Sequence, residues 1–334
     1  MKRILVFTLS IALLASFTLF MAAKAQDKKN PDVQADETED VKPDRDIIPH
    51  RYNKKGADAV TKGTTGVITP QISYHGGALI GTPTIYYIWY GNWNQTNGSD
   101  NPAGQQILRD FARTIGGSAY YNINTTYSTG GYNINGAVNF GGEATDTGSQ
   151  GTRLRDSSIG AIIVTTLNQG KLPYDPNGVY FVLSSSNVSE SSGFCTLYCG
   201  WHTAGTINSG TYAGQRLRYS FVGNANRCLN ACAAQSVSPN GNAGVDGMVS
   251  IIAHELEEAA TDPDPRTGWA DSNGDENADK CAWTFGQTLF TLPSGAIYNM
   301  TLGSGTTLQR NYLIQRNLKY SAAGSTCNVS LTAQ

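Results

Sequence analysis

The sequence predicts an α+β protein: a single mixed-sheet domain, stapled by disulfides, with one zincin-like motif helix and short strands near the C-terminus. Two observations predict this class. β-branched and aromatic runs are interspersed with segments of helical periodicity, an order typical of helices packed on a mixed sheet. The 334 residues, of which 40% are hydrophobic and 10% aromatic, are also enough to bury a sizeable core.

The N-terminal 66 residues are predicted to lie outside this domain. Residues 1–25 combine a basic start, an uncharged apolar stretch and a small-x-small triplet ending at Ala25, the pattern of a cleaved secretory signal peptide. The triplet favours this interpretation over a single transmembrane anchor. Residues 26–66 are dense in charge and lack apolar periodicity, which predicts a disordered spacer or pro-segment. Residues 67–334 then form the domain.

The charge balance excludes some classes of partner. Twenty-four basic and 26 acidic residues give a formal net charge of -2, which offers no electrostatic footprint for nucleic acid or anionic lipid. No segment after the signal peptide is apolar enough to span a membrane. We therefore expect a secreted protein, extracellular or in a bacterial periplasm or at a cell surface, whose partner is an extracellular or envelope polypeptide or glycan.

The first half of the domain is predicted to hold four strands and one helix. The continuous aromatic and β-branched run Thr82–Trp93 predicts a central strand. Residues 101–117 place apolar side chains at helical spacing before a Gly-Gly stop, so a helix is expected there. Three more apolar runs predict strands at Gly160–Leu167, Gly178–Ser185 and Arg216–Asn224.

The second half is predicted to begin with the motif helix. Over Val245–Thr261 apolar residues recur at three- and four-residue spacing, the acids gather on another side, and Pro263 stops the helix. Acids at helix surfaces are usually solvated. Short strands are expected between Thr288 and Tyr320, with a hairpin turn at Ser294-Gly295.

Six cysteines in an exported protein most simply form three disulfides. The alternative for the two CxxxC pairs is a four-thiolate zinc site, but zinc motifs more often use a CxxC spacing. With every cysteine in a bridge, a thiol nucleophile is not expected. We expect the pairs Cys195 with Cys199, Cys228 with Cys232, and Cys281 with Cys327.

The stretch HELEE in the motif helix reads like the helix of a zinc peptidase in which Glu258 replaces the second histidine. His254 and Glu258 stand four residues apart, so both can face one ion from consecutive turns. Glu255 lies about 100° round the axis, where a metallopeptidase places its general base. Zinc accepts a carboxylate among its ligands, and a catalytic site takes three protein ligands and a water. A third ligand is therefore required.

The sequence offers two sources for this third ligand. One is His202, in the stretch CGWH. The other is the loop Gly268–Cys281, in which the oxygen donors are Asp271, Asn273, Asp275, Glu276, Asn277 and Asp279.

The loop has an interpretation of its own, because alternate oxygen donors are typical of calcium loops. A true EF-hand is excluded, since Glu276 stands at its glycine position and Ala282 at that of its bidentate glutamate. For the site as a whole we expect a divalent metal, zinc rather than calcium.

Three functions stay open on these residues. The first is a metal-dependent hydrolase acting on peptide bonds. The second is a non-catalytic interaction or carbohydrate-binding protein, with a structural metal or none. In the third, His254 is a buried, hydrogen-bonded histidine without an ion. Candidate sugar platforms, although a continuous aromatic strand is more often core, are Tyr86, Trp89, Tyr90 and Trp93. No GxSxG elbow is present, and LGSGTT lacks the lysine of a phosphate loop.

Several short stretches, taken together, resemble the EXORDIUM or phosphate-induced protein family of secreted plant cell-wall proteins. They fall in the family's order and cover nearly all of residues 70–330. They are YHGG (74–77), IWYGNW (88–93), CGWH (199–202), FVGN (221–224), MVSIIAHELEEAATDP (248–263) and ENADKC (276–281).

The resemblance implies an extracellular protein with one domain, and it carries over no catalytic activity. It also implies that the HExxE motif and the segment ENADKC form one site. Glu258 would then be the family's unusual second ligand, with Glu276 or Asp279 as the third.

Overall fold

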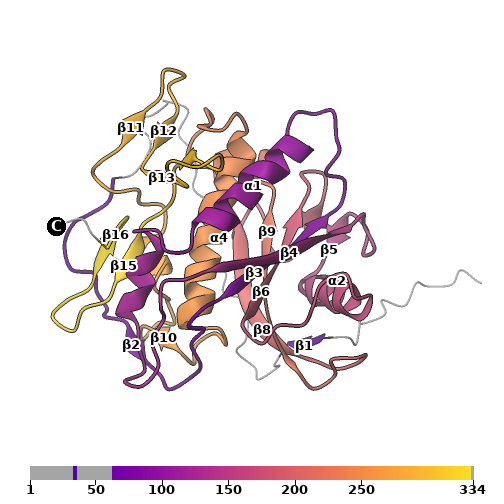
Figure 1. The fold of residues 1–334 in the computed structure, drawn as a ribbon, viewed down its shortest axis with the longest axis horizontal. Helices are drawn as coiled ribbons and strands as arrows, with labels where there is room; N and C mark the ends of the chain where they lie inside the picture. Colours follow the sequence, from indigo (N-terminus) through magenta and orange to yellow (C-terminus); the bar gives the residue numbers. More distant parts are fainter. Residues whose placement is uncertain (1–32, 36–61, 332–334) are drawn as a thin grey trace, which may run out of the picture.

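A mixed six-stranded sheet forms the centre of the protein in a computed structural model, which describes residues 33–35 and 62–331. The order of its strands is β1-β8-β9-β6-β3-β4 (Figure 1). The predicted signal peptide and most of the predicted spacer lie outside the described residues. Within the spacer, however, Val33–Ala35 forms strand β1, which pairs with β8.

Four neighbouring strands of the sheet are parallel, and the two at one edge are antiparallel. The parallel strands are β9 (Arg216–Gly223), β6 (Gly178–Ser184), β3 (Thr84–Tyr90) and β4 (Asn139–Asp146). The antiparallel strands are β8 (Gly200–Ile207) and β1. Every residue of β6 is buried, as is expected of a parallel strand that helices cover on both faces. The predicted strands at the positions of β3, β6 and β9 are confirmed.

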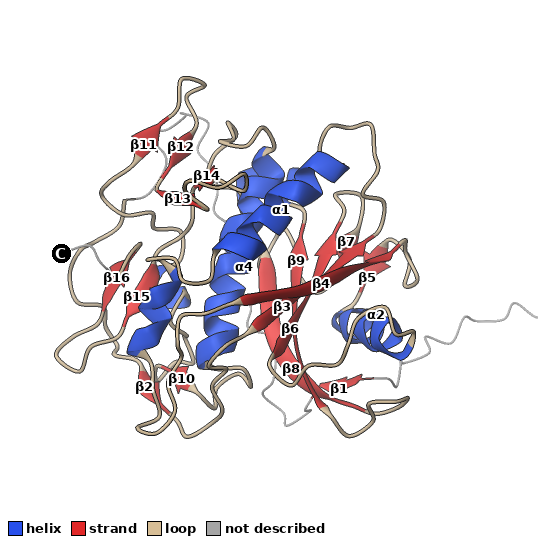
Figure 2. Cartoon of the chain, viewed as in Figure 1, coloured by secondary structure: helices blue, strands red, loops and turns tan. Residues whose placement is uncertain are grey.

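Helices α1 (Pro102–Thr114) and α2 (Asp156–Asn168) connect the parallel strands. The chain passes from β3 through α1 to β4, and then through α2 back across β3 to β6. Because such crossovers are right-handed and these two run in opposite directions, the helices lie on opposite faces of the sheet. Figure 2 shows this arrangement. The predicted helix at residues 101–117 is confirmed; it begins at Asn101, whose side chain accepts a hydrogen bond from the Gly104 amide.

The predicted strand at Gly160–Leu167 is wrong, because these residues belong to α2. A short apolar run looks the same whether it fills a buried strand or a buried helix. The start of the helix distinguishes them: the Ser158 hydroxyl accepts a hydrogen bond from the Arg155 amide, and Asp156 stands in the first turn. Eight residues of α2 are buried, so its apolar character reflects packing against the sheet.

Helix α4 (Ala243–Thr261) is the predicted motif helix. It begins at Asn242, whose side chain accepts a hydrogen bond from the Val245 amide, and its C-cap is Asp262. The alternative of a solvated acidic side is excluded, because every residue from Gly244 to Thr261 is buried. The sheet and α1 cover one side of α4, and the C-terminal segments cover the other (Figure 1).

The C-terminal third consists of short antiparallel pairs and turns. The predicted hairpin is confirmed, with Gly295 at φ 84° in its turn. The paired strands are β11 (Phe290–Thr291) with β12 (Ile297–Tyr298), β13 (Met300–Leu302) with β14 (Arg310–Tyr312), and β15 (Asn317–Lys319) with β16 (Thr326–Asn328). Elsewhere, β10 (Trp269–Ala270) pairs with β2 (Ser73–Tyr74), and β5 (Arg153–Leu154) with β7 (Ser189–Glu190). The short helices are η2 (Tyr121–Thr126), η3 (Ala225–Arg227), α3 (Leu229–Cys232) and η4 (Asp279–Cys281).

Three disulfides fasten this fold, and two of them differ from the predicted pairing. Cys195 bonds to Cys228 and Cys199 to Cys232, with Cα atoms 5.7 and 5.4 Å apart, whereas the predicted pair Cys281 with Cys327 is confirmed. The two CxxxC segments lie side by side, so each sulfur finds its partner across the gap and not four residues along its own segment. None of the helices in the described residues is long and apolar enough to cross a membrane.

Candidate metal centre

Helix α4 brings the first two predicted ligands together. His254 and Glu258 are one turn apart on the same side, and His254 Nε2 lies 2.8 Å from Glu258 Oε1. Both side chains are 1% exposed. The spacing of the HExxE motif therefore places a ring nitrogen and a carboxylate oxygen next to each other in the interior.

The turn after α4 returns the chain toward the helix. The Asp262 carboxylate accepts hydrogen bonds from the amides of Arg266, Thr267 and Gly268, at 2.7, 3.1 and 2.7 Å. Strand β10 then pairs with β2, and the loop that follows ends in η4, where Cys281 is bonded to Cys327. These constraints hold the acidic loop against α4.

The loop supplies Asp279 as the third member of this group. Asp279 Oδ1 lies 3.2 Å from His254 Nε2, and the Asp279 amide donates to Glu258 Oε1 at 3.0 Å. Zinc bonds of about 2.0–2.2 Å in a tetrahedron place ligand atoms about 3.3 Å apart. The 2.8 and 3.2 Å separations are near that value and are also those of hydrogen bonds from a His254 N–H, so His254, Glu258 and Asp279 form a group that could hold a zinc ion.

His202, the other candidate, comes to the same place from strand β8. Its Nδ1 lies 3.4 Å from Glu255 Oε2 and 3.6 Å from Glu258 Oε2, and its Nε2 lies 3.5 Å from Glu276 Oε2. His202, Glu255 and Glu258 thus form a second group able to hold a metal, which shares Glu258 with the first. Glu276 faces His202, so of the two predicted loop ligands only Asp279 joins His254.

Gly200 makes this close approach of β8 to α4 possible. A Cβ at this position would lie 2.5 Å from Ile251 Cγ2 and 3.2 Å from Glu255 Oε1. Because the first of these separations is shorter than real Cβ contacts, a larger residue would push strand and helix apart at the level of the site.

The site is buried and rich in acid. Its two imidazoles and its four carboxyl groups, on Glu255, Glu258, Glu276 and Asp279, are each at most 5% exposed. Burial raises the pKa of Glu255 and of Asp279. Burial alone would lower the pKa of each imidazole, but the adjacent carboxylates outweigh it and raise both well above the usual value. The surplus acid therefore has to be neutralised by protons or by a cation.

Several polar atoms of the site have no hydrogen-bond partner among the described residues: His202 Nδ1, His254 Nδ1 and Glu255 Oε1. The 3.4 Å separation of His202 Nδ1 from Glu255 Oε2 is within ion-pair distance but is not aligned as a hydrogen bond. An unsatisfied buried group costs about 1–3 kcal/mol. Of these atoms, His202 Nδ1 faces Glu255 and Glu258, so an ion held by those three residues would give it a partner.

The alternate oxygens of the loop do not converge as a calcium loop requires. Asp271 contacts the ammonium group of Lys280, and Asp275 Oδ2 lies 3.5 Å from the same group. Asn277 instead donates to Asn124 Oδ1, at 3.2 Å. Since Lys280 already neutralises the outer carboxylates of the loop, the acids that face α4 are the ones left for an ion.

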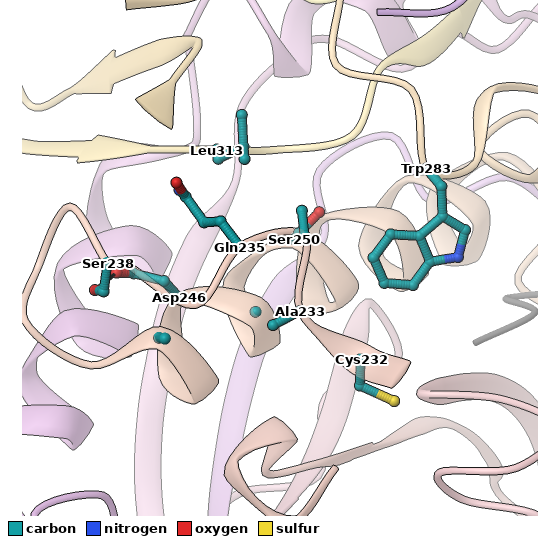
Figure 3. A pocket seen from close by; sticks show the side chains of 11 residues that line it. Cys232, Ala233, Gln235, Ser238, Asp246, Ser250, Trp283 and Leu313 are labelled. Atoms are coloured by element: carbon teal, nitrogen blue, oxygen red, sulfur yellow. Dashed lines mark hydrogen bonds between the residues drawn. The ribbon is translucent and has the colours of Figure 1, made fainter. Parts of the chain in front are cut away.

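The aromatic residues proposed as sugar platforms belong to the core. They are at most 5% exposed, and the Trp93 indole donates a hydrogen bond to the Leu183 carbonyl. The pocket in Figure 3 lies along the N-terminal half of α4 and is lined by Asp246, Ser250 and Trp283 among others, with none of the six site residues. The candidate metal site is therefore separate from this pocket.

Sequence reasoning did not find Glu257, which stands three residues after His254 in α4. It is 0% exposed, and its Oε2 accepts a hydrogen bond from the Tyr120 hydroxyl at 3.1 Å. Burial raises its pKa well above the usual value. The available signal was its spacing of three residues from His254, which places neighbouring side chains on a helix.

Comparisons with known proteins agree on one family. The phosphate-induced protein 1 conserved region matches residues 72–328. The chain is 31% identical to Protein EXORDIUM-like 3 of Arabidopsis thaliana over 284 residues, which are 73% of this chain and 79% of that protein. It is 30% identical to Protein EXORDIUM-like 5 of the same plant, over 58% of each chain. It is 27% identical to Protein PHOSPHATE-INDUCED 1 of Nicotiana tabacum, over 77% of this chain and 87% of that protein. No solved structure matches.

Proposed function

This chain belongs to the phosphate-induced protein 1, or EXORDIUM, family, and from that premise and the geometry of the site we propose that it is an exported protein that binds a divalent metal. The proposed ligands are His254, Glu258 and Asp279, and the proposed metal is zinc rather than calcium. Three disulfides support export, because such bridges form and persist in oxidising compartments.

One observation carries the metal proposal. In the interior, His254 Nε2 lies 2.8 Å from Glu258 Oε1 of the same helix and 3.2 Å from Asp279 Oδ1 of the loop. Both separations are near the spacing between the ligands of a tetrahedral zinc ion. Zinc prefers a nitrogen donor with carboxylates far more than calcium does, because calcium takes six to eight oxygen ligands.

The burial of this site favours a structural role for the ion. Structural zinc sites are closed by protein, whereas catalytic ones keep an open position. The ion would join α4 to the loop that Cys281 and Cys327 hold, and so brace the covered face of the helix. The exported protein would then act by contacting a polypeptide or glycan outside the cell.

Metal analysis tests the proposal. The purified protein is dialysed against metal-free buffer, and zinc and calcium are measured by mass spectrometry beside His254→Ala. The matched control is His75→Ala, because His75 is an exposed histidine that belongs to neither group able to hold a metal. We expect zinc in the wild type and the control and its loss in His254→Ala. Equal zinc in all three proteins, or none in the wild type, would refute it.

A metal-dependent hydrolase is the second candidate, and the position of Glu255 favours it. Glu255 adjoins His254 in the motif order of zinc peptidases, and burial raises the pKa of its carboxyl group, as suits a general base working near neutral pH. When bound, the metal would polarise a peptide carbonyl and its attacking water. Glu255 would accept the proton of that water and pass it to the leaving amine.

The variant Glu255→Gln separates these two candidates. As a base, Glu255 is required for turnover, so the variant should keep zinc and lose cleavage of a peptide library. Because the site is closed, a substrate reaches Glu255 only when the loop over α4 opens. Cleavage by the variant at the wild-type rate would exclude Glu255 as the base, and a wild type that cleaves no peptide while fully loaded with zinc would exclude the hydrolase.

A further inference from the structure

We propose that the centre holds a second divalent ion, bound by His202, Glu255 and Glu258, so that the Glu258 carboxylate bridges two ions. This inference rests on the proposed metal site and extends it from one ion to two. It also gives Glu255 the role of a ligand, where the hydrolase candidate makes it a base.

The two oxygens of Glu258 face different partners. Oε1 lies 2.8 Å from His254 Nε2, and Oε2 lies 3.6 Å from His202 Nδ1. The other carboxylate of the second group, Glu255, places Oε2 3.4 Å from the same ring nitrogen. These separations match the spacing of about 3.3 Å between the ligands of a tetrahedral zinc ion. A carboxylate that bridges in this way places two ions about 3.5–4 Å apart, as in two-metal sites.

The second nitrogen of His202 fixes the direction in which the first one points. Nε2 lies 3.3 Å from the Asp262 carbonyl oxygen, to which it can donate a hydrogen bond, and it lies 3.5 Å from Glu276 Oε2, within ion-pair distance. A metal-binding histidine almost always donates its other ring N–H to such an oxygen. With its proton on Nε2, His202 turns the lone pair of Nδ1 toward Glu255 and Glu258.

That orientation calls for a cation. The Nδ1 lone pair would face two carboxylate oxygens at 3.4 and 3.6 Å, an arrangement that is repulsive when nothing positive lies between them. Nδ1 and Glu255 Oε1 also have no hydrogen-bond partner among the described residues, although both side chains are 1% exposed. Without an ion, a proton on Nδ1 takes this place, because the adjacent carboxylates outweigh burial and raise the pKa of His202 well above the usual value, and a bound ion would displace that proton.

Zinc stoichiometry tests the second position. The metal-free protein is saturated with Zn²⁺, freed of excess by gel filtration and analysed for zinc per chain. We expect two equivalents in the wild type and in His75→Ala, one in His202→Ala and one in His254→Ala. Glu258→Ala should retain fewer than one, because it removes the bridge.

Two further measurements keep the test decisive. If His202→Ala fails to fold by circular dichroism, His202→Gln replaces it, because glutamine fills a similar volume. Titration of the metal-free protein with Co²⁺ should give visible absorbance that rises to two equivalents. One equivalent in the wild type, lost in His254→Ala but kept in His202→Ala, would overturn the second ion and leave the first. No bound zinc in the wild type would overturn both.

Discussion

The pairing of the two CxxxC segments predicts that removing both bridges between them costs more stability than the sum of the two single removals. With Cys199–Cys232 absent, Cys195–Cys228 closes a loop of 33 residues, for which chain entropy gives about 3.7 kcal/mol. When one bridge is present, the other closes a ring of only about ten residues, worth about 2.7 kcal/mol. Removing either bridge should therefore cost about 2.7 kcal/mol, and removing both about 6.4 kcal/mol.

Urea unfolding followed by tryptophan fluorescence measures these losses. The variants are C195A/C228A, C199A/C232A and the four-alanine protein, each fitted with its own m value, because losing a cross-link expands the denatured chain. Bridges within each CxxxC segment would instead close two five-residue loops, each worth about 2.1 kcal/mol, or about 4.1 kcal/mol in total. Free-thiol titration of denatured C195A/C228A supplies the control: we expect no thiol. Two thiols and a combined loss near 4 kcal/mol would refute the pairing.

Four other changes test the fold and the site. Leu256→Ala, at 0% exposure in α4, should cost 2–5 kcal/mol in urea unfolding, roughly the cost of a core cavity, whereas a loss below 1 kcal/mol would contradict the packing. Asp262→Ala removes the acceptor of three amide hydrogen bonds, so it should lower the free energy of unfolding by about 1–3 kcal/mol and weaken zinc retention. An unchanged free energy of unfolding and unchanged zinc retention would contradict a role of this turn in holding the loop against α4. Gly200→Ala should destabilise the protein by about 1–3 kcal/mol, because its Cβ meets Ile251, and a neutral effect in thermal melts would show that β8 sits farther from α4. Carboxylates outweigh burial and raise the pKa of His254, so zinc must displace protons when it binds. Zinc binding should therefore weaken as the pH falls, and calorimetry in buffers of different ionisation enthalpy should report proton release. A binding enthalpy that is the same in every buffer would contradict this.

The local parts of the fold were predictable from the sequence. The spacing of His254 and Glu258 and the stop at Pro263 describe α4 well, because helix geometry depends on neighbours three and four residues away. The aromatic run around Trp89 predicts an interior strand for the same local reason. By contrast, the apolar run of α2 satisfies strand and helix patterns alike, and only the cap around Ser158 decides between them.

Long-range placement was not predictable. Nothing in the segment CGWH indicates that His202 faces Glu255, because β8 is brought beside α4 by the pairing of β8 with β9 and by the close contact at Gly200. The partners of Cys195 and Cys199 depend on that same placement. Burial of the acids was missed because it is the C-terminal segments, distant in sequence, that cover the second side of the helix.

Anomalous X-ray diffraction at the zinc absorption edge tests the central claim most directly. Crystals of the protein loaded with zinc should show a peak about 2.0–2.2 Å from His254 Nε2, Glu258 Oε1 and Asp279 Oδ1. The same data should show a second peak beside His202 Nδ1 if the bridged centre is correct. A single peak at Asp271 in the outer loop, or no anomalous peak within bonding distance of His254, would contradict the account.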